Sequence, residues 1–338
     1  MKVRSHANIP VFIPHLGCPN QCVFCDQRAI SGVCEFSEED VTRRIEEALH
    51  TLDGSGKECE IAFFGGSFTG IDRALMIRLL DLAESYVQSG KVLGIRMSTR
   101  PDYIDDEIID IIGGYTLTEV ELGVQSMTDR VLASSKRGHT VSDTVLACKK
   151  LKTAGIPFVG QMMIGLPASA AEDEIYCAER ICELGAVGSR IYPTVVFRRT
   201  ELQKMSECGN YTPLSTEEAV CRSVNALEVF VSHGVKCLRI GLCESEALHS
   251  EEKYYAGPSH PAIGELVRGE LYFRRIKNAL ENSEVTAKTI TVEVPSGDIS
   301  AAVGIKKKNR LRLEELTGGK VKFTENNLLE PYSVRITL

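Results

Sequence analysis

Three closely spaced cysteines are the residues with the clearest chemical potential in this chain of 338 residues. They are Cys18, Cys22 and Cys25, a C-x3-C-x2-C spacing that lets one loop offer three thiolates to a single metal centre. A 4Fe-4S cubane has four irons, so three thiolates leave one iron without a protein ligand. An open iron is a coordination position for a substrate or cofactor, like the open position of a catalytic zinc site. The spacing therefore indicates a catalytic iron–sulfur cluster.

Two alternatives remain open for this loop. Its cysteines could bind zinc, with Cys34 as a fourth ligand, or they could be ordinary reduced thiols. Zinc sites favour pairs of cysteines two to four residues apart and need a nearby fourth ligand, which the loop itself does not supply.

The loop, with Phe24 directly before its third cysteine, resembles the signature of the radical S-adenosylmethionine (SAM) enzymes. This resemblance implies that the open iron binds the amino and carboxylate groups of SAM. It also implies that an electron from the 4Fe-4S cluster cleaves SAM to a 5'-deoxyadenosyl radical. Flavodoxin or ferredoxin is the kind of electron donor that such an enzyme needs.

The composition is that of an ordinary globular protein, with 43% hydrophobic and 25% charged residues. The chain has no apolar run near the roughly 20 residues of a membrane span and no secretory segment at its start, so we expect a cytoplasmic protein. Twelve cysteines then predict reduced thiols and metal ligands instead of a disulfide framework. The net charge of −7, from 39 basic and 46 acidic residues, argues against indiscriminate nucleic-acid binding.

Short apolar runs alternate with longer amphipathic segments, which is the pattern of βα units. We expect strands near residues 9–13, 61–64, 92–97, 117–124, 157–164 and 189–195, with helices near 37–52, 72–88, 104–112, 142–154 and 171–184. Six such units predict an α/β fold, a partial (β/α)6 barrel, with ligands at the carboxyl ends of the strands.

Unusual residues occur where these strands end. Two glycines after the second strand let the backbone approach a ligand and offer carbonyl groups to an ammonium ion. No Walker A lysine follows them. Each residue also has an ordinary interpretation, as a simple turn, a satisfied polar group or a solvated charge. The candidates are Gly65, Gly66, Ser67, Ser98, Gln125, Arg137 and Met163.

Together these stretches resemble the radical SAM half of the Elongator catalytic subunit, a tRNA wobble-uridine modifying enzyme, over roughly residues 8 to 245. More distantly they resemble the oxygen-independent coproporphyrinogen oxidases. The resemblance implies that the glycine stretch binds the SAM amino group and that Arg137 pairs with the SAM carboxylate. It further implies contacts from Ser98 and Gln125 to the ribose and methionyl part, and from Phe24 and the Met163-Ile164 backbone to the adenine.

The chain departs from the Elongator subunit after the radical SAM region. That subunit carries an acetyltransferase domain, whereas only some ninety residues follow position 245 here, without a glycine-rich CoA-type loop. Acetyl-CoA chemistry within this chain is therefore not expected, and the group transferred stays open.

The C-terminal residues 285–338 predict a small α+β module: a strand at 289–294, helices at 298–303 and 308–316, and a strand at 320–325. This order resembles a KH RNA-binding module, whose G-x-x-G loop clamps the nucleic-acid backbone. Lys307 replaces the second glycine, so the loop is degenerate and we expect a weaker clamp. The predicted RNA contacts are Gly304, Lys306, Lys307, Lys308 and Arg310.

The charge of this module supports the same interpretation. It holds nine Lys and Arg against six Asp and Glu, a balance of +3, which leaves −10 for the remaining residues. A basic module on an acidic enzyme suits RNA delivery to an active site. The alternative is a structural appendage with a solvated basic face.

These features predict a radical SAM barrel at 1–245, a connecting segment at 246–284 with a turn-rich boundary at 254–261, and the KH-like module at 285–338. No second cysteine cluster occurs in the sequence. The other cysteines are expected to be mostly buried, with Cys243 the best candidate for a further functional thiol.

The function that we predict is modification of RNA, with tRNA the best guess, by a radical SAM enzyme. One alternative is a radical SAM enzyme that acts on a protein or small molecule, its KH-like module being purely structural. Another is a non-catalytic RNA-binding protein with a redox-sensing cluster. The sequence does not specify the base, its position or the oligomeric state.

Overall fold

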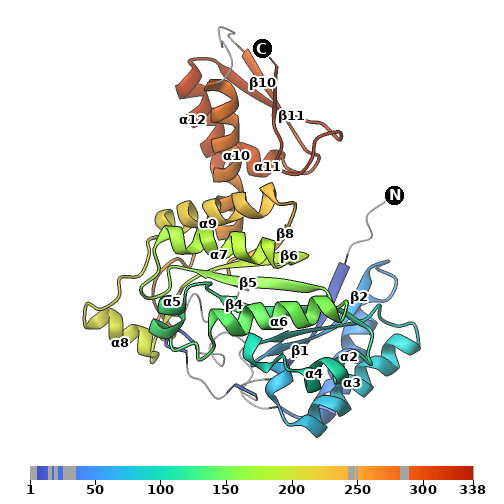
Figure 1. Ribbon diagram of the computed structural model, residues 1–338. Helices are drawn as coiled ribbons and strands as arrows, with labels where there is room; N and C mark the ends of the chain where they lie inside the picture. The colour runs from blue at the N-terminus through green and yellow to red at the C-terminus, as the bar shows by residue number, and fades with distance from the viewer. Residues whose placement is uncertain are drawn as a thin grey trace.

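The computed structural model describes residues 6–13, 17–18, 22–25, 36–242, 248, 250–281 and 289–337. A large α/β domain carries a smaller C-terminal module, which stands above it in Figure 1. Within the described ranges, no helix has the length and apolar character needed to cross a membrane. Cys34 and Cys243 lie outside the described residues.

The large domain is built on a curled sheet of seven parallel strands in the order β1-β2-β3-β4-β5-β6-β8. Six strands were expected, and the seventh, β8, forms the far edge beside β6. The alternation of buried and exposed residues in β8 is weak, because Lys236 and Arg239 are exposed and the residues between them are only half-buried. The strands are β1 His6–Ile13, β2 Glu58–Gly65, β3 Ile95–Thr99, β4 Leu117–Gln125, β5 Phe158–Ile164, β6 Gly188–Pro193 and β8 Lys236–Ile240.

Helices between the strands pack their apolar faces against the sheet, as the βα pattern predicts (Figure 1). Their ends follow local chemistry: the side chain of Asp72 accepts a hydrogen bond from the backbone N–H of Leu75, and Thr140 and Asp143 form a capping box. The helices of this domain are α2 Glu38–Leu52, α3 Arg73–Gln88, α4 Asp106–Ile112, α5 Asp129–Ser134, α6 Val141–Thr153, α7 Ala171–Glu183, α8 Glu201–Glu207 and α9 Thr216–Ser232.

A buried charge network lies on the strands and was not predicted. Arg96 on β3 forms ion pairs with Glu60, Glu119 and Glu121. Nη2 of Arg190 on β6 lies 2.6 Å from Glu121. Buried charges are tolerated when they are paired in this way, and the pairs tie β2, β3, β4 and β6 together.

One long helix, α10 (Ile263–Glu281), belongs to both parts of the molecule. Val267 and Leu271 contribute to the core of the large domain, while Tyr272, Ile276 and Leu280 contribute to the core of the C-terminal module. The predicted connecting segment therefore contains a helix that couples the two cores. The turn-rich stretch at 254–261 also begins in a strand, since β9 (Tyr254–Ala256) pairs with β7 (Val196–Phe197).

The C-terminal module follows the predicted order of elements closely. Its sheet has the order β11-β10-β12, with β10 parallel to β11 and antiparallel to β12. The expected strands at 289–294 and 320–325 are confirmed, and both helices begin or end within one residue of expectation. The elements are β10 Thr289–Val294, α11 Ile299–Val303, η4 Ile305–Lys307, α12 Lys308–Thr317, β11 Lys320–Glu325 and β12 Arg335–Thr337.

Candidate functional site

A pocket of about 260 Å³ lies at the carboxyl ends of the parallel strands. It gathers the three cysteines with every residue that the resemblance implies for SAM except Ser67. Ligands bind at this edge in open α/β sheets, because the loops that follow parallel strands all meet there. Its lining is Phe12, Cys18, Cys22, Phe24, Cys25, Gly65, Gly66, Ser98, Thr99, Arg100, Gly123, Gln125, Arg137, Gln161, Met163, Tyr192, Pro193, Val195, Phe197 and Leu242.

Close backbone contacts hold the cysteine loop against the glycine turn. Gly17 has φ +73, and a Cβ there would lie 2.4 Å from the carbonyl oxygen of Ser67. Gly65 has φ +121, and its Cβ would lie 2.4 Å from the carbonyl oxygen of Ile13. Glycine is required at both positions, because any side chain would push the loop away from the sheet.

Two further backbone hydrogen bonds anchor the second half of the loop. The N–H of Val23 donates to the carbonyl of Ser135 at 3.1 Å, and the N–H of Leu202 donates to the carbonyl of Val23 at 2.8 Å. These contacts come from α5 and α8, neither of which the sequence analysis had predicted.

The three cysteines line one pocket, but no three His, Cys, Asp or Glu side chains in the described part of the chain are gathered around a single ion position. A cubane cluster takes each cysteine on a different iron, so its thiolates do not converge on one point. Three thiols on a pocket wall therefore fit a 4Fe-4S cluster as a donor set.

Buried polar atoms in the pocket fit a polar cofactor. Gln125 ends β4 with φ +65, is 5% exposed, and its Oε1 has no hydrogen-bond partner among the described residues. Arg137 donates from Nη2 to the carbonyl of Gly123 at 2.9 Å, and its Nη1 lies 3.5 Å from Sγ of Cys22. Its Nε is buried without a partner in the described structure. Buried polar groups are normally paired, so these two atoms fit a ligand that supplies partners. Oε1 of Gln125 could accept from a hydroxyl group of SAM, and Nε of Arg137 could donate to its carboxylate.

The other predicted SAM contacts divide into two groups. Phe24 and Met163 lie with Phe12, Val195 and Phe197 among the apolar side chains of the lining, as an adenine ring requires. The fully buried side chain of Ser67, by contrast, bonds to Oγ1 of Thr99 at 2.7 Å and accepts a bond from the backbone N–H of Arg100. Ser67 supports the site from beneath and does not line the pocket.

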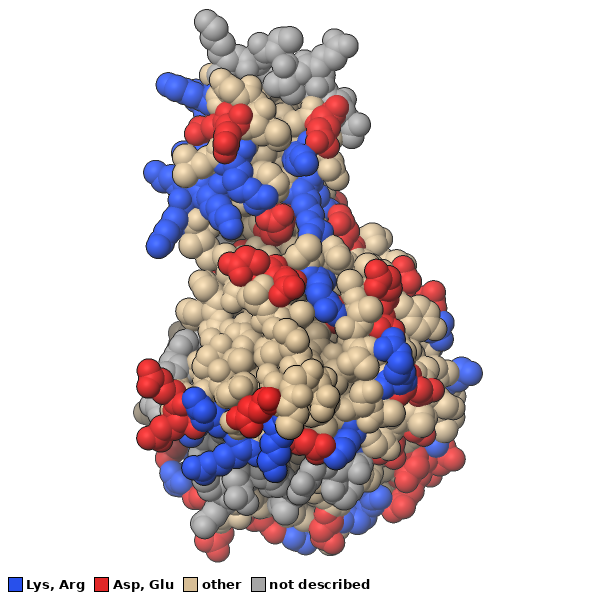
Figure 2. All heavy atoms as spheres, turned by 90° about the vertical axis from the view of Figure 1, so that its left-hand side faces the viewer, with Lys and Arg blue, Asp and Glu red and all other residues tan. Residues whose placement is uncertain are grey.

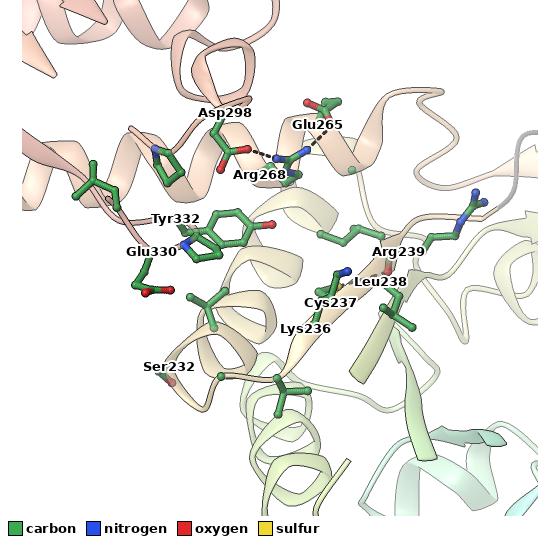
Figure 3. A pocket seen from close by; sticks show the side chains of 18 of the residues that line it. Ser232, Lys236, Cys237, Leu238, Arg239, Glu265, Arg268, Asp298, Glu330 and Tyr332 are labelled. Carbon is green, nitrogen blue, oxygen red and sulfur yellow. Dashed lines mark hydrogen bonds and ion pairs between the residues drawn. The ribbon is translucent and has the colours of Figure 1, made fainter. Parts of the chain in front are cut away.

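A second, larger cleft of about 1340 Å³ separates β8 from the C-terminal module (Figure 3). Arg268 of α10 lines this cleft and forms ion pairs with Glu265 on the same helix and with Asp298 of the C-terminal module. Tyr332 lies beside this group. None of the predicted cofactor residues lines the cleft.

The loop before α12 has an unexpected backbone. Lys306 and Lys307 both adopt left-handed conformations, with φ +53 and +62. The lysine at the second glycine position thus adopts the backbone geometry that a glycine would favour. A Cβ on Gly304 would lie 2.9 Å from Cγ of Asn309, so this glycine is needed for close packing of α12. Lys308 is exposed, and the guanidinium of Arg310 lies 5.7 Å from the ring centroid of Phe323.

The remaining described cysteines are only partly as expected. Cys59, Cys148 and Cys177 are buried, and burial raises the pKa of the Cys148 thiol to about 12. Cys208 and Cys221 are exposed, which the expectation of mostly buried cysteines did not anticipate.

Comparison with known proteins agrees with this geometry. The radical SAM superfamily matches residues 12–176, and the radical SAM C-terminal domain matches residues 187–272. An uncharacterized protein of Methanocaldococcus jannaschii is 30% identical over 231 residues, which cover 65% of this chain and 70% of that protein. The chain belongs to the radical SAM superfamily, whose enzymes use a 4Fe-4S cluster and SAM.

Within this superfamily the similarity points toward the Elongator group. The tRNA uridine(34) acetyltransferase of M. jannaschii is 35% identical over 194 residues, which cover 52% of this chain and 36% of that protein. The chain thus spans about a third of that relative's length. The solved structure of archaeal Elp3 from Methanocaldococcus infernus shares the fold, with a TM-score of 0.64 and 24% identity over 82% of this chain and 64% of that one.

His139, which is 3% exposed beside the pocket, allows a test of the buried electrostatics. Burial and the positive charge of Arg137 lower the pKa of His139 to about 4. Below pH 6.5 the unfolded chain protonates this histidine and the native chain does not, so stability falls as the pH drops toward 4. We expect His139→Gln to reduce the stability difference between pH 7 and pH 5 by about 2 kcal/mol, measured by urea unfolding. The exposed His233 provides the control, and an equal pH dependence in His139→Gln and wild type would contradict the burial argument.

Proposed function

We propose that this radical SAM enzyme modifies RNA, with tRNA as the substrate class. The cluster, when bound, supplies the electron that cleaves SAM, and an external donor such as flavodoxin or ferredoxin supplies that electron to the cluster. Cys18, Cys22 and Cys25 would hold the cluster, while Arg137 and Gln125 would orient SAM. The observation that carries the RNA proposal is a basic module fixed to the catalytic domain by a shared helix.

The charge on the molecular surface supports this proposal. Figure 2 shows Lys and Arg side chains gathered over the C-terminal module on the side where Figure 1 places α12. Below them, a broad area of the large domain shows few charged side chains. A basic cluster attracts the phosphate backbone without sequence preference, which suits a substrate that is positioned by one part and modified by another.

Contacts on both sides of α10 attach the module to the large domain. Arg274 of α10 donates to the side-chain oxygen of Asn225 on α9 at 2.7 Å. On the module side, Asn309 of α12 donates to the carbonyl of Gly269 at 2.7 Å, and Arg312 pairs with Glu270 at 2.7 Å. Because α10 has polar contacts on both sides, it can hold the basic loop at a defined distance from the catalytic pocket. A flexible tether would not define that distance.

The names of the relatives are consistent with the same substrate class. A tRNA uridine(34) acetyltransferase and several Elongator complex proteins match the radical SAM part of this chain.

Crosslinking under anaerobic conditions tests the proposal directly. The intact protein, reconstituted with iron and sulfide, is irradiated with total cellular RNA, and the bound RNA is sequenced. We expect enrichment of tRNA over its share of the input. A profile that matches the input RNA would contradict the proposed substrate class.

The basic loop allows a quantitative test on the enriched RNA. Each phosphate contact to a single strand contributes about −0.7 to the slope of log K against log salt. Replacing Lys306 and Lys307 by alanine should therefore flatten the slope by about 1.4 units and weaken binding at low salt. SAM cleavage without RNA should not change, because both lysines lie in the C-terminal module.

Two controls separate charge from backbone and from general electrostatics. Lys307→Gly keeps the left-handed conformation and removes only the charge, so it should flatten the slope by about half as much as the double variant. The exposed Lys149 and Lys152 on α6, changed together to alanine, serve as a charge-matched pair. An equal slope change in both double variants would contradict a specific role for the loop.

A further inference from the structure

A second buried arginine in the SAM pocket has no role in the function described so far. Arg100 follows β3, lines the pocket, and is 2% exposed, which makes it one of the most buried side chains in the protein. Burying a guanidinium ion without partners costs free energy, so each of its three nitrogens is expected to have a hydrogen-bond partner.

Two of those nitrogens are paired with one carboxylate. Nε of Arg100 donates to Oδ1 of Asp102 at 2.9 Å, and Nη2 donates to Oδ2 at 2.8 Å. This bidentate contact fixes the plane of the guanidinium group. The third nitrogen, Nη1, is buried and has no hydrogen-bond partner among the described residues. The fixed geometry thus leaves one charged donor available on a wall of the pocket.

The cysteine loop lines the same pocket as Arg100. Burial lowers the pKa of the Arg100 guanidinium, but Asp102 raises it to a net value above its usual range. Arg137 contacts this loop directly, since its Nη1 is 3.5 Å from Sγ of Cys22. Two arginines therefore line the same pocket as the cysteine loop, and only Arg137 has an implied role in binding SAM.

We infer that Arg100 donates a hydrogen bond from Nη1 to a sulfur of the iron–sulfur cluster and thereby raises the reduction potential of the cluster. One-electron reduction adds a negative charge to the cluster, so a nearby cation stabilises the reduced form. Hydrogen bonds to the sulfurs act in the same direction. Asp102 holds Arg100 in place and partly offsets its charge.

This inference rests on the cofactor site and not on the RNA substrate, so failure of the RNA crosslinking would leave it unaffected. Its test is an anaerobic redox titration of the reconstituted holoenzyme, with the reduced cluster followed by electron paramagnetic resonance. Iron content and SAM affinity are measured on the same samples. These readouts do not depend on turnover.

Opposite shifts from two variants are the expected result. Arg100→Gln removes the positive charge and should move the midpoint potential to a more negative value, with iron content and SAM affinity retained. Asp102→Asn removes the offsetting negative charge and should move the potential to a more positive value. A merely structural role for the ion pair would move both variants in the same direction. Arg73→Gln, on the half-exposed start of α3, is the control and should change nothing.

Three outcomes would overturn the inference. An unchanged midpoint potential in Arg100→Gln would show that Nη1 does not face the cluster. A loss of SAM affinity with unchanged potential would assign Arg100 to the SAM carboxylate instead. If Arg100→Gln loses its iron, Arg100→Lys and Asp102→Asn decide the matter, and the absence of a positive shift in Asp102→Asn then overturns the inference.

Discussion

Cys22→Ala should lose both the 4Fe-4S cluster and all SAM cleavage. Cys22 is buried on the wall of the pocket beside Arg137, and the spacing leaves no spare cysteine within the loop to replace its thiolate. Removing one of three cluster ligands exposes a second iron, and such a cluster is not expected to survive. The measurements are iron and sulfide content, the visible absorption of the cluster, and release of 5'-deoxyadenosine with dithionite and SAM.

The exposed Cys208 provides the matched control for this prediction. It lies at the end of α8, and Cys208→Ala should keep full iron content and SAM cleavage. Circular dichroism of Cys22→Ala should remain that of the wild type, because the sheet and its core are formed by other residues. Stoichiometric zinc in the wild-type protein, or SAM cleavage by Cys22→Ala, would contradict the cluster assignment.

Much of the fold could be predicted because the strands carry apolar side chains that pack against the helices, and such runs can be recognised in the sequence. Val120, Leu122 and Val124 on β4 illustrate this, since all three belong to the apolar core. The spacing of the cysteines alone likewise identifies the candidate cluster ligands, Cys18, Cys22 and Cys25.

The sequence analysis missed the charged side chains that are buried inside the protein. Glu121 on β4 and Arg190 on β6 are buried and paired although they are 69 residues apart in sequence, and no local pattern identifies such a pair. Arg100 follows the candidate residue Ser98 by two positions, but the sequence does not distinguish it from a surface arginine. Only the structure shows its burial and its contact with Asp102.

The shared helix α10 was missed for a different reason. It lies at the boundary between two cores, so its apolar residues contact two partners and do not follow the periodicity of one face. Val267 and Tyr272, for example, belong to different cores although they are only five residues apart. The domain boundary was inferred from turn residues alone. It therefore placed a connecting segment at 246–284, where the chain forms the helix that the two cores share.

Arg137→Ala should weaken SAM binding ten- to a hundredfold. Arg137 is 7% exposed, its guanidinium donates to the carbonyl of Gly123, and its buried Nε has no partner among the described residues. A charge-assisted hydrogen bond in such a site contributes about 1.5 to 3 kcal/mol, and each 1.4 kcal/mol corresponds to about tenfold in affinity. The affinity for SAM is measured by anaerobic calorimetry on protein with known iron content.

Two further variants make this result specific. Arg137→Lys keeps the charge but loses the planar fork, so its SAM affinity should lie between those of wild type and Arg137→Ala. Arg130→Ala removes an arginine that pairs with Asp173 at the surface, and it should bind SAM as the wild type does. Because Nη1 of Arg137 also lies near Cys22, the comparison holds only for samples with equal iron content. Unchanged SAM affinity in Arg137→Ala at full iron content would show that another group binds the SAM carboxylate, and Arg100 would then be the first residue to test.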